Sequence, residues 1–248
     1  MLKNCFLTFI VLFLCSVSFG QNLQKMQVWQ DSLYKIAQNV FAQTAEVERI
    51  ESNFLFVKTL VSALKEPNSY FYDFHKLNMI SAVRSPDDSF RIFTWNVPLQ
   101  DGSYLYYGSI QFKSGTLKLI PLLDKTFEIA DIHTNELNNS VWYGAQYYEI
   151  VPFRPNQYLL LGWKGHDAIV SKKVIEVLTI DPQGKVKLGA TIFSDNPKIT
   201  RKIFTYAKQA TMLLQYNKND KRIEFDHLIP LKGGKKDQNV PDMSYDAY

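Results

Sequence analysis

The apolar residues between about residue 21 and residue 65 recur at steps of three and four. They are Met26, Trp29, Leu33, Ile36 and Val40, followed by Val47, Ile50, Phe54, Val57, Val61 and Leu64. This spacing places each set on one face of a helix, so it predicts two helices or one long kinked helix. Pro67 and Asn68 end the pattern, because proline has no amide donor and restricts the residue before it. We expect residues 21–85 to lie on the main body as an amphipathic helical segment; a coiled-coil partner helix is the alternative.

After Ser85-Pro86-Asp87-Asp88 the apolar residues alternate with polar ones, which is typical of strands with one buried face. Turn-forming stretches separate the alternating runs, among them Gln100-Asp101-Gly102 and Asp181-Pro182-Gln183-Gly184. The pattern predicts strands near 90–97, 103–113, 116–123, 141–152, 157–163, 172–181, 185–193, 201–216 and 221–229.

Short connections between these runs make neighbouring strands antiparallel. The fold class is therefore mainly β, with an antiparallel barrel or a strongly twisted sheet of about nine strands and the N-terminal helical segment packed on it. A sandwich is the compact alternative. The β body is expected over residues 86–230, and residues 231–248 form a tail that includes a truncated last strand.

The first twenty residues have the features of a secretory signal peptide. Lys3 precedes an apolar run from Phe6 to Cys15, and small residues, Ser18 and Gly20, stand before Gln21. A membrane anchor is the alternative, but no basic cluster follows the run to stop transfer. We expect cleavage after Gly20, no transmembrane anchor after removal of the leader, and a periplasmic or envelope-associated protein.

Cleavage would remove both cysteines, Cys5 and Cys15, and leave 228 of the 248 residues. A chain of this length buries enough surface to be stable without disulfides. The net charge of +4 is spread along the chain, and only Lys232, Lys235 and Lys236 come close together. A nucleic-acid partner is therefore not expected.

Several stretches resemble a group of uncharacterised secreted proteins from Bacteroidetes. They are residues 85–87 with 90–97, Trp142-Tyr143-Gly144-Ala145, Leu159 to Trp163, Lys172 to Leu178, and Tyr245-Asp246-Ala247-Tyr248. The resemblance implies export and a shared fold, and it implies no activity. Members of that group often have Asp after the Gly-Trp pair where this chain has Lys164, and they continue past Tyr-Asp-Ala into another strand.

Two of the four histidines adjoin carboxylates, in His166-Asp167 and Asp226-His227. If the pairs met at one rim of a sheet, they could hold a divalent metal or divide general acid and base roles. Adjacent strand residues point to opposite faces, so each pair would offer one side chain to a site. The alternative is a loop position for His166 and an edge-of-core position for His227. Neither a catalytic motif nor a cofactor-binding motif is present, so no cofactor is implied.

Aromatic residues crowd the middle strands, above all at Trp142, Tyr143 and Trp163. They could form a platform for a sugar, peptide or apolar ligand, or they could be buried on both faces beneath the helices. The first hypothesis is a non-enzymatic exported binding or interaction module that takes an envelope protein or a small ligand through these three residues. The second is a hydrolase, metal-assisted or not, that uses His166, Asp167, Asp226 and His227.

Overall fold

The computed structural model describes residues 23–42, 45–114 and 117–248. The predicted signal peptide, with both cysteines, lies outside the described residues. The chain divides into two compact units. The first contains the described residues up to Met79 together with Ser114 and Leu117, and the second contains the rest.

The first unit is helical, as the step of three and four predicts. Residues 23–42 form one helix, and α2 (Glu46–Leu64) forms another. Each helix buries one apolar stripe, which includes Met26, Leu33, Ala37 and Val40 in the first helix and Phe56, Leu60, Ala63 and Leu64 in α2. Glu66, just after α2, accepts a hydrogen bond from Trp29 Nε1 at 3.0 Å and pairs with Lys25 Nζ at 2.8 Å. The 3-10 helix η1 (Ser69–Phe71) follows Asn68, whose φ is +62°.

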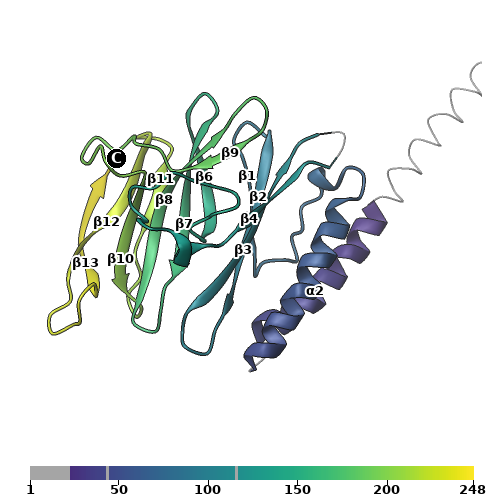
Figure 1. Cartoon of the computed structure of the whole chain (residues 1–248), viewed down its shortest axis with the longest axis horizontal. Coiled ribbons are helices and arrows are strands. Elements are labelled where there is room, and N and C mark those ends of the chain that lie inside the picture. The colour runs from purple at the N-terminus through teal and green to yellow at the C-terminus, as the bar shows by residue number, and fades with distance from the viewer. Residues whose placement is uncertain (1–22, 43–44, 115–116) are drawn as a thin grey trace, which may run out of the picture. The chain divides into compact units, whose positions relative to one another are not determined.

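The second unit contains three antiparallel sheets (Figure 1). The first sheet has the order β1-β2-β3-β4 and is a meander of β1 (Ser81–Arg84), β2 (Phe90–Pro98), β3 (Tyr104–Phe112) and β4 (Leu119–Leu123). The strands β2 and β3 pair along their whole length, from Phe90↔Phe112 to Pro98↔Tyr104. The strand β4 is shorter, and the 3-10 helix η2 (Thr126–Glu128) follows it.

The second sheet has the order β5-β9-β8-β7-β6. The strand β10 also pairs with β8, along residues 170–176, whereas β9 pairs with residues 178–180. Its strands are β5 (Leu137–Asn138), β6 (Gln146–Arg154), β7 (Gln157–Gly165), β8 (Val170–Ile180), β9 (Val186–Leu188) and β10 (Arg201–Ala207). The third sheet contains β11 (Leu214–Asn217), β12 (Arg222–Pro230) and β13 (Asn239–Ala247) in that order.

The second sheet is the middle layer of this unit, because alternate residues of its strands enter two different cores. Leu160, Val174 and Leu178 join a core with residues of the first sheet such as Ile92 and Ile110. The intervening residues, Leu161, Ile175 and Val177, join a second core with Leu214, Ile223 and Phe225 of the third sheet. Strands, not helices, therefore cover the second face in this unit.

The mainly β class is confirmed, with 42% strand and 20% helix. The described strands do not close into a barrel, so that part of the prediction is not confirmed. Three expected strands were too long. The 141–152 run begins as a strand only at Gln146, the 185–193 run keeps only β9, and the 201–216 run divides into β10 and β11. The expected tail contains a full strand, β13, and the sequence pattern also missed β1 and β5.

Candidate functional site

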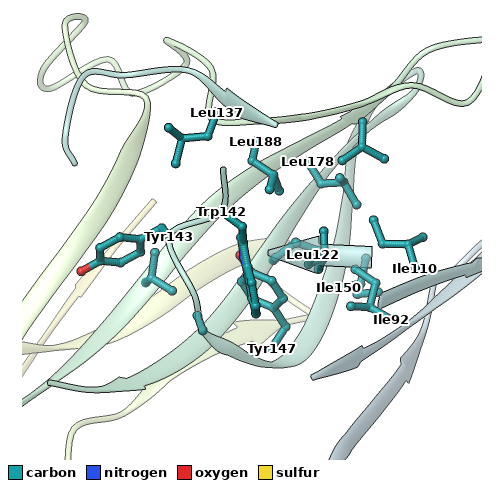
Figure 2. Packing of buried hydrophobic residues seen from close by; sticks show 14 of the residues in the cluster. Ile92, Ile110, Leu122, Leu137, Trp142, Tyr143, Tyr147, Ile150, Leu178 and Leu188 are labelled. Carbon is teal, nitrogen blue, oxygen red and sulfur yellow. The ribbon is translucent and has the colours of Figure 1, made fainter. Parts of the chain in front are cut away.

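Two of the three aromatic residues predicted to bind ligand are buried. Trp142 is 0% exposed and Tyr143 is 1% exposed, and both belong to the core between the first and second sheets (Figure 2). Trp142 Nε1 donates to the Tyr147 hydroxyl at 2.8 Å, which satisfies its polar atom inside the core. The prediction of an exposed platform at Trp142 and Tyr143 is therefore corrected, because both faces of this part of the chain are covered.

Trp163 is partly buried against the other core, between the second and third sheets. Its ring meets the Tyr104 ring edge-to-face, with centroids 5.5 Å apart, and it shares a hydrogen bond with Tyr206. Because these contacts occupy the ring, we assign Trp163 to packing between layers.

The first histidine–carboxylate pair lies at the turn between β7 and β8. His166 Nε2 is 3.9 Å from Asp167 Oδ2, and burial lowers the pKa of His166, as does the nearby charge of Lys172. Asp167 Oδ1 accepts the main-chain amides of Ile169 and Val170 at 2.7 and 2.8 Å. Asp167 therefore closes the turn.

The second pair lies on β12, and its members have separate partners. His227 Nδ1 is 2.8 Å from Asp246 Oδ2 on β13, and this hydrogen bond raises the pKa of the exposed imidazole. Asp226 Oδ2 instead accepts the amide of Leu213 at 2.7 Å. Among the described residues, no group of three or more His, Cys, Asp or Glu side chains could hold a metal ion. The four residues thus do not assemble the predicted hydrolytic site.

A pocket of about 470 Å³ lies within the second unit, where β4 ends and β7 ends. We call it the Lys164 pocket. Its lining comes from three stretches: Tyr104 to Tyr107 of β3, Leu122 to Phe127 around the end of β4, and Lys164 to His166.

Lys164 is a lysine buried at this pocket, with an exposed fraction of 4%. Its Nζ donates to the carbonyl oxygens of Tyr143 and Gly144 at 2.6 and 2.7 Å, and to Thr126 Oγ1 at 3.1 Å. The rings of Tyr106 and Tyr143 have centroids 4.5 and 4.6 Å from Nζ. All three ammonium protons therefore have acceptors, and aromatic faces add cation–π attraction.

Burial lowers the pKa of Lys164 to about 8, although the attraction to the Asp124 carboxylate acts in the opposite direction. Lys172, which is directly opposite on β8, lowers it further. At neutral pH the amine still carries its proton, since the two carbonyls stabilise the charged form. The geometry therefore favours a fixed cation over a general base, although Thr126 Oγ1 is within hydrogen-bonding distance.

Asp124 organises the wall beside this lysine. Its Oδ1 accepts the Thr126 amide at 3.1 Å and the Thr126 hydroxyl at 2.6 Å, and its Oδ2 accepts the Tyr106 amide at 3.3 Å. Gly144, with φ +67°, packs on the carboxylate so closely that an added Cβ would lie 2.6 Å from Asp124 Cγ. Glycine is therefore required there, both for the backbone conformation and for space.

The rim of the pocket is apolar and exposed. Phe127 of η2 is 84% exposed, and Leu123 at the end of β4 is 46% exposed. Lys125 Nζ lies 5.5 Å from the centre of the Phe127 ring and pairs with Glu128 at 2.6 Å. The pocket therefore combines a floor of internally bonded polar groups with an exposed apolar rim, which can hold a ligand by contact.

Sequence reasoning missed Asp124, Thr126 and Phe127. Thr126 and Phe127 lie in a short 3-10 helix outside the periodic pattern, and no motif marks them. Lys164 directly follows the predicted strand 157–163, so the pattern placed it outside the buried run. Comparisons with protein-family models, curated proteins and solved structures found no match. None of the described helices is long and apolar enough to span a membrane.

Proposed function

We propose that this chain is an exported, non-enzymatic binding module of the periplasm or cell envelope, and that its ligand occupies the Lys164 pocket. Export is proposed from the leader features of residues 1–20. The proposed ligand site is therefore the Lys164 pocket. The rings of Trp142, Tyr143 and Trp163 contact its lining residues Tyr106, Lys164 and Tyr104.

The observation that carries the proposal is the exposure of Phe127 at the mouth of a pocket with a polar floor. A phenylalanine that is 84% exposed buries little apolar surface on folding, whereas a ligand that covers it would bury more. Binding needs no proton transfer, which suits a lysine whose protons are all donated to protein acceptors.

No observation in the described residues favours the hydrolase alternative. Asp167 stabilises a turn, and Asp226 and His227 bond to separate neighbours. We therefore propose binding alone.

Photo-crosslinking in the native host tests the site. A photoreactive phenylalanine analogue at position 127 should give a defined adduct, and the same analogue at Met243, which is 92% exposed on β13, should not. Equal adducts at both positions, or none at position 127, would contradict the pocket as the binding site.

Fractionation tests export separately. The mature protein should be recovered outside the cytoplasm with Gln21 as its first residue. Recovery of the intact chain from the cytosol would contradict export without bearing on the pocket.

A further inference from the structure

In the part of the chain that the structure describes, one edge of β3 has no paired strand at the Lys164 pocket. The strand β2 pairs with β3 as far as Pro98↔Tyr104, but β4 pairs with β3 only from Gln111↔Leu119 to Tyr107↔Leu123. The first residues of β3 therefore extend past the end of β4, and these same residues line the pocket.

The main-chain groups that face this gap follow from the strand parity. Phe112 N donates to the Lys118 carbonyl near the start of β4, so even-numbered residues of β3 turn their N–H and C=O groups toward β4. Tyr106 obeys the same parity, because its N–H donates to the Asp124 carboxylate. Tyr104 comes next and has the same parity, so its pair with Pro98 on β2 is of the non-hydrogen-bonded kind. The N–H and C=O groups of Tyr104 therefore point to the position that β4 would occupy if it continued beside β3 after Leu123.

The departure of β4 has a local cause. After Leu123 the chain pairs instead with residue 142, since Trp142 N donates to the Leu123 carbonyl at 2.9 Å and Lys125 N donates to the Trp142 carbonyl at 3.0 Å. The Asp124 side chain takes the place of a main-chain partner for Tyr106. This diversion leaves an open edge where a regular strand would have continued.

We infer that the ligand of the Lys164 pocket is an extended peptide segment, which adds to the open edge of β3 beside Tyr104. This inference rests on the proposed function and deepens it. One peptide residue would exchange both main-chain hydrogen bonds with Tyr104, as strand addition requires. The neighbouring peptide side chains would contact Leu123 and Phe127, the exposed apolar residues of the rim.

The chemistry of the gap favours a peptide over other small ligands. A donor and an acceptor on one strand residue, at the spacing of a β ladder, match the groups of an extended main chain. The floor offers few other free groups, because Lys164 and Thr126 already bond to protein atoms. Recognition would therefore depend on backbone hydrogen bonds and apolar side chains.

Peptide display followed by an N-methyl scan tests this inference. Random twelve-residue peptides are selected on the purified protein, with counter-selection on the Phe127→Asp variant, whose exposed position should leave the fold intact. One selected peptide is then N-methylated at single positions. Methylation should weaken binding about three- to tenfold at the one position whose amide donates to the Tyr104 carbonyl, and leave the other positions unchanged.

Amide exchange on the ¹⁵N-labelled protein gives a second readout. The Tyr104 amide should exchange about tenfold more slowly at saturating peptide, while the exposed Met243 amide on β13 should not change. A flat N-methyl scan with no protection of Tyr104 would overturn strand addition.

The two proposals fail in different ways. A crosslinked partner at position 127 with a flat N-methyl scan would keep the binding function and reject the peptide edge. Failure to select any peptide that prefers the wild-type protein to the Phe127→Asp variant would also reject the peptide edge. If position 127 gives no adduct in addition, both proposals fail.

Discussion

Two groups of charged residues lie on the same face of the second sheet, and they are built differently; all of them except the half-buried Lys172 are buried. Glu176 and Arg201 face each other on β8 and β10, and both side chains are 0% exposed. Lys164 and Lys172 face each other on β7 and β8, and they carry the same sign. The first group is closed, whereas the second borders a pocket.

The closed group satisfies its own charges. Arg201 Nε lies 3.1 Å from both carboxylate oxygens of Glu176, and the remaining guanidinium donors reach main-chain carbonyls, among them Asn135 at 3.0 Å. Burial still raises the pKa of Glu176, although Arg201 opposes this. A pair of this kind joins β10 and the 131–136 loop to the sheet, which is a structural role.

The open group lacks such a balance. Lys164 is held by carbonyls instead of a carboxylate, and its cross-strand neighbour Lys172 repels it. Like charges directly opposite each other reduce stability, so folding alone gives no reason for this arrangement. The difference teaches that buried charge by itself does not mark a site, whereas buried charge beside an open pocket does.

The largest expected effect is on the closed group. Glu176→Gln should lower the free energy of unfolding by about 3–5 kcal/mol, because the Arg201 charge then stays buried without a counter-charge. Urea denaturation followed by tryptophan fluorescence measures the change. The double variant Glu176→Leu with Arg201→Met should recover part of the loss. A loss below about 1 kcal/mol would show that the carbonyl acceptors alone hold Arg201.

A smaller effect is expected for Lys164→Met. This variant keeps the length of the side chain but removes the donor from the Gly144 carbonyl, at a cost of about 1–3 kcal/mol in the free energy of unfolding. The Tyr143 carbonyl also loses its lysine donor, and the single hydroxyl proton of Thr126, 2.6 Å away, is donated to Asp124 Oδ1 instead. Thr126→Val, which leaves both lysine bonds to carbonyls in place, should cost less. A gain in stability for Lys164→Met would mean that burial of the charge outweighs its hydrogen bonds.

The stability difference between wild type and Lys164→Met should depend on pH. The pKa of Lys164 is about 8 in the folded chain and 10.5 ordinarily. Between these values the unfolded chain binds more protons than the folded chain, so wild type gains stability as the pH rises through this range. The slope is at most about 1.4 kcal/mol per pH unit. Denaturation of both proteins from pH 7 to pH 10 measures this slope. The other lysines titrate in both proteins, so their contributions cancel in the difference between the two free energies of unfolding. A constant difference would place the pKa of Lys164 near its ordinary value.

Sequence pattern predicted the individual helices and strands better than their arrangement or the site. The helical stripes and the strands at 90–97, 103–113 and 157–163 were found, because burial of one face imposes a period on the residues. The 201–216 run was assigned to one strand because apolar residues continue through the turn that separates β10 and β11. Periodicity reports which residues are buried, and it cannot report where a buried stretch turns.

The site was predicted poorly for a related reason. Trp142 and Tyr143 were read as exposed or buried beneath helices, whereas neighbouring strands bury them. Whether an aromatic ring meets solvent depends on which sheet covers it, and this is a long-range property. The pocket depends on the early end of β4 and on the bridge from Asp124 to Trp142, neither of which leaves a periodic trace.

The smallest effect should come from the like-charged neighbour. Lys172→Met removes the charge opposite Lys164, so it should raise the pKa of Lys164 and stabilise the fold by about 0.2–1 kcal/mol at neutral pH. Lys173→Met is the matched control, because Lys173 points to the other face of β8, where it pairs with Trp163. Titration of the lysine side chains by NMR measures the pKa. If Lys172→Met left the pKa of Lys164 unchanged while Lys173→Met moved it, the two lysines would not share the face that the register assigns to them. If only Lys172→Met raises the pKa of Lys164, the repulsion between Lys164 and Lys172 lowers the stability of the fold at the pocket. Glu176 and Arg201 have opposite charges, so no such repulsion acts between them.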